Sequence, residues 1–219
     1  MPTLLFDLDG TLVDTAADFV AILSTMCEQQ GILPPSAEVI RNTVSDGARA
    51  LVTLCFQVQE NQPEFTTLQQ TLLERYALSV GQAATLFNGM QEVLLACAKQ
   101  QNSWGIITNK PWRFTEPLIQ QIFSNPEHRH LAPKSIICPE HVSSPKPNPE
   151  GILLACEQLA VAPEHCLYIG DHRRDIEAGK NANMPTVACR YGYVKPDDQI
   201  VDWQADYIID KPIDLLRLL

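Results

Sequence analysis

The sequence TLLFDLDGTLVD, residues 3–14, decides the fold prediction, because a short apolar run ends there in a pair of acidic residues. Residues 3–6 have the length and composition of a buried strand. Asp7 and Asp9 follow two residues apart, and side chains at this spacing on an extended chain project to the same side. Gly10 then allows a tight turn. Taken alone, the two acids fit an ordinary turn after a strand equally well.

Similar apolar runs recur along the chain, with room for a helix between them. They cover residues 104–107, 135–138, 166–169, 185–188 and 207–209, and the middle runs lie about 20 to 30 residues apart. This alternation is typical of a parallel sheet covered by helices. We therefore predict an α/β fold with a Rossmann-like, doubly wound parallel sheet.

The long interval between the first two runs, close to a hundred residues, breaks this rhythm and contains no convincing strand. Helices are predicted at residues 14–31, 36–43, 47–58 and 64–79 from apolar spacing and from stops such as Gly31. We expect an all-helical cap domain at residues 15–80, inserted into a core domain of residues 1–14 and 81–219. Ligands bind beyond the carboxyl ends of parallel strands, so this insert would cover the site as a lid.

Charge and composition exclude several classes of partner. With 16 basic and 26 acidic residues the net charge is −10, which disfavours nucleic-acid and anionic-membrane surfaces. No apolar run approaches the roughly 20 residues that span a bilayer, and the N-terminus lacks the basic start of a signal peptide. The seven cysteines form no C-x-x-C motif, which fits buried thiols of a reducing compartment. We expect a cytoplasmic monomer or homodimer that binds a small molecule, with no nucleic acid and no membrane.

Two further stretches carry polar groups where strands should end. The sequence GIITNK, residues 105–110, ends its strand in Thr108 and Asn109, whose hydroxyl and amide can bind a phosphate oxygen. The sequence SSPKPNP, residues 143–149, presents Lys146 in a loop stiffened by three prolines. Taken singly, these are ordinary loop residues and a solvated lysine; together they fit an anion site.

The sequence LYIGDHRRD, residues 167–175, repeats the pattern of an apolar run that ends in acid. Asp171 falls at the strand end, and Asp175 follows on the first turn of the next predicted helix. Each acid alone fits a helix cap or a first-turn charge. However, all four stretches should meet at one edge of one sheet, and such agreement by chance is improbable.

These residue types together suit the hydrolysis of a phosphate monoester. A carboxylate nucleophile must approach a dianion, so charge has to be neutralised first. Acids at positions 7, 9 and 171 can bind one hard divalent cation through oxygen, as Mg²⁺ prefers. Lys146 adds positive charge, and Thr108 bonds phosphoryl oxygens. Asp7 is then the nucleophile and Asp9 the general acid and base.

The motifs D-x-D-G-T-L-V-D, T-N-K, S-P-K-P and G-D-x-x-x-D, in this order, resemble the haloacid dehalogenase superfamily of phosphatases. The helical insert after the first motif resembles the cap of that superfamily. Residues 108–111, TNKP, and 190–193, RYGY, look like its phosphoglycolate phosphatase branch. The cap segment SDGARA, residues 45–50, and the tail around residues 202–203 look closer still to relatives acting on N-acetylmuramic acid 6-phosphate.

The resemblance implies roles for the catalytic and metal-binding residues. Asp7 corresponds to the nucleophile and to a magnesium ligand, and Asp171 to a second ligand. Asp9 corresponds to the acid/base residue, with its backbone carbonyl also on the metal. Asp175 corresponds to the last acid of the fourth motif, which lies beside the ligands rather than among them. Phosphate binding is implied for Thr108, Asn109 and Lys146.

The substrate is less determined than the chemistry. Phosphoglycolate and N-acetylmuramic acid 6-phosphate share a phosphate and a carboxylate, so a cation in the cap would suit either. Arg49 is the candidate, since its guanidinium can pair with a carboxylate through two hydrogen bonds. The alternative for Arg49 is an arginine on a solvated helix face.

Other functions remain open. A sugar phosphomutase of the same superfamily would keep Asp9, whereas a dehalogenase has no need of it. A non-catalytic phosphate-binding protein, or a receiver-like domain phosphorylated on Asp7, is the alternative from another class. Intact Asp9 and Lys146 argue against it, because binding alone needs no proton shuttle.

Overall fold

The computed structural model describes the backbone of residues 1–219 and the side chains of all of them except residues 126 and 127. At its centre lies a parallel sheet with the strand order β5-β4-β1-β6-β7-β8. The strands are β1 (Thr3–Phe6), β4 (Gly105–Ile107), β5 (Ser135–Ile137), β6 (Cys166–Gly170), β7 (Thr186–Cys189) and β8 (Tyr207–Ile209). The chain builds outward from β1 through β4 to β5 and then continues on the other side of β1 with β6. This is the predicted doubly wound sheet, and its switch point lies between β1 and β6.

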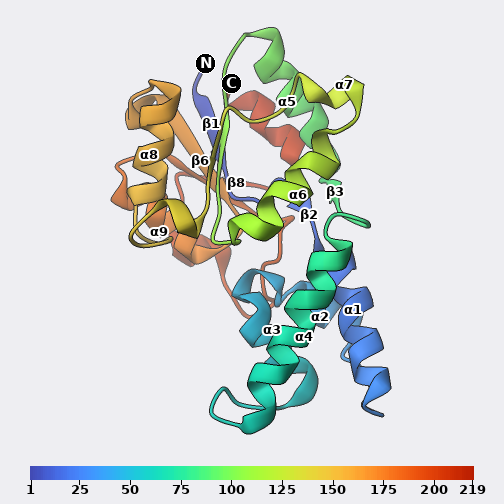
Figure 1. Cartoon of the computed structure of the whole chain (residues 1–219). Coiled ribbons are helices and arrows are strands. Elements are labelled where there is room, and N and C mark those ends of the chain that lie inside the picture. The colour runs from blue at the N-terminus through green and yellow to red at the C-terminus, as the bar shows by residue number, and fades with distance from the viewer.

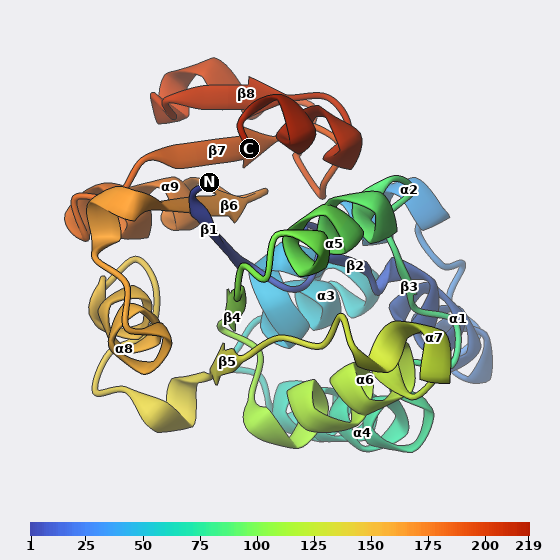
Figure 2. The same ribbon diagram turned by 90° about the horizontal axis from the view of Figure 1, so that it is seen from above.

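Helices cover both faces of the sheet, as Figure 2 shows from above. One face packs against α5 (Met90–Lys99), α6 (Trp112–Phe123) and the 3₁₀ turn η5 (Pro212–Arg217). The other packs against α8 (Glu150–Leu159) and α9 (Arg173–Asn181). Residues of β1 alternate between them: Leu4 and Phe6 are buried on the first side, and Leu5 on the second. The short α7 (Pro126–Arg129) follows α6.

Four further helices form a separate layer beside the sheet edge where β1 ends (Figure 1). They are α1 (Ala16–Gln29), α2 (Ala37–Arg41), α3 (Gly47–Phe56) and α4 (Pro63–Ser79), as predicted to within a few residues. Their apolar faces pack into a core of their own, which includes Leu23, Leu51 and Leu72, all fully buried. The same core includes Phe114 of α6 and Tyr193, which follows β7, so it also joins the helical layer to the sheet domain.

We predicted no strand in the long interval between the first two apolar runs, and this prediction is wrong. Two short strands, β2 (Val13–Asp14) and β3 (Thr85–Leu86), pair antiparallel and connect the sheet to the helical layer. Two residues are too few to show the alternation by which a strand is recognised in a sequence. As a result, α1 begins at Ala16 rather than at Asp14, and the chain enters and leaves the helical layer side by side.

The start of α1 is fixed by a residue far along the chain. Tyr193 is buried, and its hydroxyl accepts hydrogen bonds from the backbone N–H groups of Thr15 (2.7 Å) and Ala16 (2.9 Å). The same hydroxyl donates to Asp14 Oδ1 at 2.8 Å. Thr15 occupies the N-cap position without capping the helix, because its own hydroxyl donates to Asp9. A tyrosine therefore replaces the usual local N-cap.

Among the described residues, no helix combines the length and apolar character that a membrane crossing requires. The seven cysteines are buried and free of disulfides, as expected from their apolar surroundings.

Candidate active site

A cluster of buried carboxylates lies at the switch point of the sheet. Asp7 follows β1, Asp171 follows β6, and Asp175 lies in the first turn of α9. Each has an oxygen within 4.8 Å of the others, and all three are at most 4% exposed. Burial, together with the charges of Asp7 and Asp175, raises the pKa of Asp171 to about 8. A bound cation would therefore relieve the repulsion between these carboxylates.

Lys146 supplies part of that charge. Its Nζ lies 2.7 Å from Asp7 Oδ1 and 2.7 Å from Asp175 Oδ1, and its side chain is 2% exposed. Burial alone would lower the pKa of Lys146, but the carboxylates of Asp175 and Asp7 raise it above its ordinary value. One ammonium against three carboxyl groups leaves an excess of hard oxygen ligands, which is the donor chemistry that Mg²⁺ prefers. The residues present thus fit a magnesium ion.

Glycine makes the close approach around Asp171 possible. Gly10 has a φ of +82°, and a Cβ there would lie 2.1 Å from Asp171 Oδ2. A Cβ on Gly192 would lie 2.2 Å from the Cβ of Asp171. With these approaches open, Asp171 accepts hydrogen bonds from Thr11 Oγ1 at 3.2 Å and from the backbone N–H of Tyr193 at 2.8 Å. Two loops from opposite ends of the chain thus orient one carboxylate.

Asp9 faces away from the acid cluster. Its carboxylate pairs with Lys110 Nζ at 3.0 Å and accepts a hydrogen bond from Thr15 Oγ1 at 2.5 Å. Burial alone would lower the pKa of Lys110, but Asp9 raises it above its ordinary value. The structure does not bring the Asp9 carboxylate to the other acids, so only its backbone carbonyl remains for the metal role expected from the sequence.

Asn109, one of the predicted phosphate-binding residues, lines the cavity described below and also forms two hydrogen bonds with the lysine loop. Its side chain accepts a hydrogen bond from the Lys146 backbone N–H (3.1 Å) and donates one to the Lys146 carbonyl (3.0 Å). The amide thus holds the lysine loop in place. Thr108 is buried, and its hydroxyl accepts a hydrogen bond from the backbone N–H of Lys110 at 3.1 Å.

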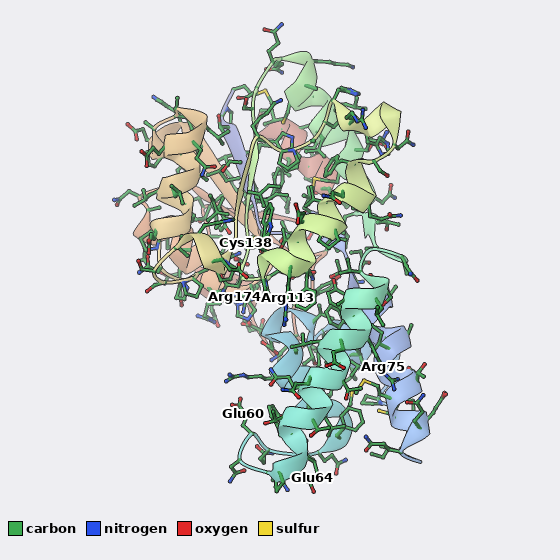
Figure 3. The ribbon with its side chains drawn as sticks, in the orientation of Figure 1. Glu60, Glu64, Arg75, Arg113, Cys138 and Arg174 are labelled. Carbon is green, nitrogen blue, oxygen red and sulfur yellow. The ribbon has the colours of Figure 1, made fainter. Side chains whose placement is uncertain are left out.

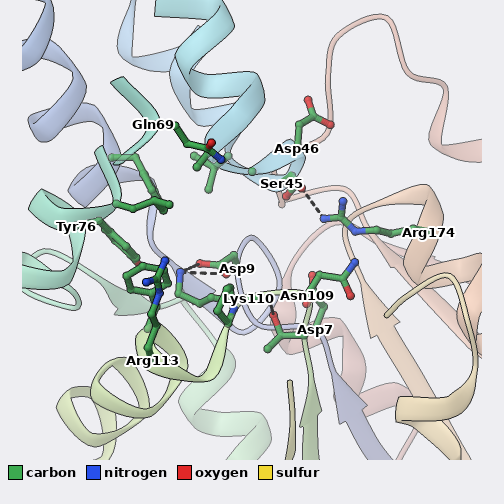
Figure 4. A pocket seen from close by; sticks show the side chains of 18 residues that line it. Asp7, Asp9, Ser45, Asp46, Gln69, Tyr76, Asn109, Lys110, Arg113 and Arg174 are labelled. Carbon is green, nitrogen blue, oxygen red and sulfur yellow. Dashed lines mark hydrogen bonds and ion pairs between the residues drawn. The ribbon is translucent and has the colours of Figure 1, made fainter. Parts of the chain in front are cut away.

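A cavity of about 390 Å³ opens between the sheet and the helical layer (Figure 4). Residues from both parts line it: Asp7, Asp9, Phe19, Val44, Ser45, Asp46, Gly47, Ala48, Gln69, Leu73, Tyr76, Thr108, Asn109, Lys110, Pro111, Arg113, Phe114 and Arg174. It therefore joins the first two motifs to the cap, as the sequence predicts for a lid over the site. Its volume is within the range of pockets that enclose organic ligands.

Three cations of the lining, Lys110, Arg113 and Arg174, were not among the predicted site residues. Arg174 lies on the first turn of α9, and one of its terminal nitrogens donates to the Ser45 carbonyl at 2.5 Å. Lys110 and Arg113 flank the start of α6. All three lie inside or just beyond the motif stretches quoted above. A basic residue next to a motif was therefore the one feature of the sequence that could have identified them as site residues.

The structure corrects the expectation for Arg49. Its side chain is 66% exposed, pairs with Glu60 at 3.1 Å and is absent from the lining of the cavity. Figure 3 shows Glu60 well away from the junction where Arg113 and Arg174 lie. The helix was predicted, but the direction of this side chain depends on how the helix packs, which the local sequence does not reveal.

The helical layer also contacts the acid cluster directly. Asp46, in the 3₁₀ turn η1 (Val44–Asp46), pairs with Lys195 at 2.5 Å and approaches His172 Nε2 at 3.6 Å. Burial by itself raises the pKa of Asp46, but hydrogen bonds from His172 and Lys195 lower it by more. Ser45 donates to Asp171 Oδ2 at 3.2 Å. This segment thus fixes the helical layer over the acids.

Comparisons with known proteins agree with this geometry. A family model described as haloacid dehalogenase-like hydrolase matches residues 4–189. The N-acetylmuramic acid 6-phosphate phosphatase of Pseudomonas aeruginosa PAO1 is 42% identical over 219 residues, which is 100% of this chain and 95% of that protein. The phosphoglycolate phosphatase of Xanthomonas campestris pv. campestris strain 8004 is 34% identical, over 95% of this chain and 91% of that protein.

A solved structure, described as a predicted phosphoglycolate phosphatase from Haemophilus somnus 129PT, superimposes with a TM-score of 0.82. The match covers 100% of this chain and 97% of the other at 23% sequence identity, and it shows that the fold is shared.

Proposed function

The chain belongs to the haloacid dehalogenase-like hydrolase family, and we propose that it is a magnesium-dependent phosphatase of N-acetylmuramic acid 6-phosphate. The likeness to a phosphatase of that name extends over the whole chain, cap included. The four motifs and the acid cluster support the reaction type.

One observation carries the phosphatase proposal: the two acids of the first motif are separated. Asp7 lies among the buried carboxylates beside Lys146, whereas Asp9 lines the cavity beside Lys110. Hydrolysis in two steps needs a nucleophile and a separate proton carrier. Phosphate binding alone requires no such division.

In the proposed first step, an Asp7 oxygen attacks phosphorus and the ester oxygen leaves. Asp9 gives this oxygen its proton, so that the sugar departs as a neutral alcohol and Asp7 carries the phosphoryl group. In the second step, Asp9 takes a proton from water, whose oxygen attacks the same phosphorus. Inorganic phosphate leaves, and the Asp7 carboxylate and the protonated Asp9 are restored.

The surrounding residues stabilise the charge of the phosphoryl group. Lys146 lies beside Asp7, and Thr108 lines the same cavity as Asp7. A bound Mg²⁺, held by Asp7 and Asp171, would neutralise charge between the nucleophile and the phosphate. Such fixed charges and donors contribute most of the catalysis in phosphoryl transfer.

Phosphoglycolate is the second candidate substrate, because a relative of that activity is 34% identical to this chain. The cavity of about 390 Å³ favours the larger sugar acid, since a two-carbon ester would leave much of it unfilled. A phosphomutase of the same superfamily would instead return the phosphoryl group to a second hydroxyl of a sugar.

A panel assay with purified protein and Mg²⁺ tests the proposal. We expect fastest release of phosphate from N-acetylmuramic acid 6-phosphate, slower release from phosphoglycolate and from an aryl phosphate, and no turnover after chelation. Asp7→Asn should abolish turnover while the circular dichroism spectrum and thermal midpoint stay close to those of the wild type.

Three results would contradict parts of the proposal. Full activity in Asp7→Asn would show that Asp7 is not the nucleophile. Phosphoglycolate as the best substrate would replace the sugar acid, and transfer between sugar hydroxyls without release of phosphate would establish a mutase.

A further inference from the structure

We propose that Arg113 and the hydroxyl of Tyr76 bind a carboxylate of the substrate, at the side of the cavity away from Asp7. The inference rests on the proposed function, because it assigns the organic part of the same substrate. It replaces Arg49 with a residue of the sheet domain.

Arg113 is exposed like Arg49, but it lines the cavity and forms no ion pair with any described carboxylate. Its guanidinium lies 4.6 Å from the ring centre of Phe114, which is buried against the helical layer. The acids that line the cavity are engaged elsewhere: Asp7 with Lys146, Asp9 with Lys110, and Asp46 with Lys195. Arg113 is therefore available to pair with an anionic ligand.

Tyr76 contributes a second polar group, whose hydroxyl lies near the ammonium of Lys110 but donates to no described acceptor. The residue is 1% exposed, yet its hydroxyl forms no hydrogen bond with any described group. A buried polar group left in this state is costly, so a ligand that accepts its hydrogen bond would be favoured. Burial raises the pKa of Tyr76 to about 12, which keeps the hydroxyl protonated and able to donate.

The Tyr76 ring is held firmly in place. It stacks on Phe19 with 4.3 Å between ring centres, and it packs at a tilt against Phe114 at 5.3 Å. Lys110 Nζ lies 4.6 Å from the ring centre. This side of the cavity therefore combines rigid aromatic walls with positive charge, as a site for an organic anion requires.

The positions of the two ends set the shape of the substrate. In Figure 4 the Asp9–Lys110 pair lies between Tyr76 and Arg113 on one side and Asp7 and Arg174 on the other. A phosphate at Asp7 and a carboxylate at Arg113 must then belong to a molecule with a body between them. The substrate class is a sugar phosphate with an acidic side chain remote from the phosphate.

The test compares two sugars that differ in the acidic group. N-acetylglucosamine 6-phosphate has the ring, the acetamido group and the phosphate of N-acetylmuramic acid 6-phosphate but lacks the lactyl carboxylate. Arg113→Gln should raise the KM for the acidic sugar about 10- to 100-fold relative to the KM for the neutral one, the range for hydrogen bonds to charged groups. Tyr76→Phe should change the same ratio about 2- to 10-fold.

Arg49→Gln is the matched control, since it removes an exposed arginine that pairs with Glu60 outside the cavity. It should keep the wild-type ratio of KM values. If Arg113→Gln leaves the ratio of the two KM values unchanged, whether or not both values rise, the inference is overturned.

A binding measurement separates this inference from the proposed function. Titration calorimetry with Asp7→Asn protein should show tighter binding of the acidic sugar phosphate than of the neutral one, and Arg113→Gln in that background should remove the difference. Equal affinities before the second substitution would overturn the inference even if the enzyme is a phosphatase. If the Asp7→Asn protein binds the acidic sugar phosphate selectively but the wild type releases no phosphate from it, only the proposed function is overturned.

Discussion

Lys146 shows how much of the site depends on one side chain. Its ammonium is buried between Asp7 and Asp175, 2.7 Å from an oxygen of each. Removal of one member of a buried ion pair leaves uncompensated charge in a medium that solvates it poorly. Stability and activity should therefore fall together when this lysine is replaced.

We expect Lys146→Met to lower the free energy of unfolding by about 3 kcal/mol, the lower end for a broken buried pair, since protonation of an acid offsets part of the loss. Turnover should fall at least about 100-fold, as when one group that stabilises the transition state is removed. Urea unfolding of metal-free protein and phosphate-release kinetics provide the two measurements.

Lys134→Met serves as the control, because Lys134 is exposed and forms no ion pair in the described part of the chain. It should change the free energy of unfolding by no more than about 0.5 kcal/mol. Similar losses in both variants would show that the buried pairs of Lys146 are not the cause.

At the scale of elements, the strands of the large sheet were predictable and their connections to the cap were not. The inner strands are buried on both faces and form nearly continuous apolar runs, as at Leu4, Leu5 and Phe6 of β1. By contrast, β2 and β3 have two residues each and exist because they pair with one another. Pairing between residues far apart leaves no local pattern.

The candidate site divides in the same way. Asp7, Thr108, Lys146 and Asp171 were predictable, because parallel strands place their carboxyl ends at one edge. Arg113 and Tyr76 were not, since their position over the cavity depends on how two layers pack. The local sequence therefore indicates which residues are expected to act on phosphate, and that role stays a prediction, but it does not single out the residues proposed to bind the organic part of the substrate.

The start of α1 yields a second prediction. Tyr193→Phe would leave the Thr15 N–H without its acceptor, whereas the Ala16 N–H keeps a 3.3 Å contact with Asp14 Oδ1. Loss of a partner for a buried backbone donor should lower the free energy of unfolding by about 1–3 kcal/mol, measured by urea denaturation.

Tyr207→Phe provides the comparison, because Tyr207 is 45% exposed and its hydroxyl forms no hydrogen bond in the described part of the structure. Its free energy of unfolding should stay within about 0.5 kcal/mol of the wild type. If the two variants lose equal stability, the hydroxyl of Tyr193 does not hold the start of α1.

For the molecule as a whole, the contact of Asp46 with Lys195 and His172 joins the cap to the sheet domain. Because the pKa of Asp46 is lowered in the folded state, the contact stabilises the docked arrangement fully at pH values above the ordinary pKa of an aspartate. The contribution is lost as the pH falls through the lowered pKa. Salt should also weaken the contact, since both partners are partly exposed.

We expect Asp46→Asn to increase the radius of gyration in small-angle X-ray scattering at low salt and to raise KM by less than about fivefold, given the modest strength of exposed ion pairs. At high salt the wild type should approach the variant. Asp197→Asn, on the exposed loop nearby, should behave as the wild type at every salt concentration. An unchanged radius in Asp46→Asn would show that other contacts suffice for docking.

The pairing of Val13 with Leu86 and of Asp14 with Thr85 has a mechanical consequence. Both tethers of the cap belong to one hydrogen-bonded ribbon, so neither can flex without the other. A movement of α1–α4 relative to the sheet would therefore have to bend both tethers together.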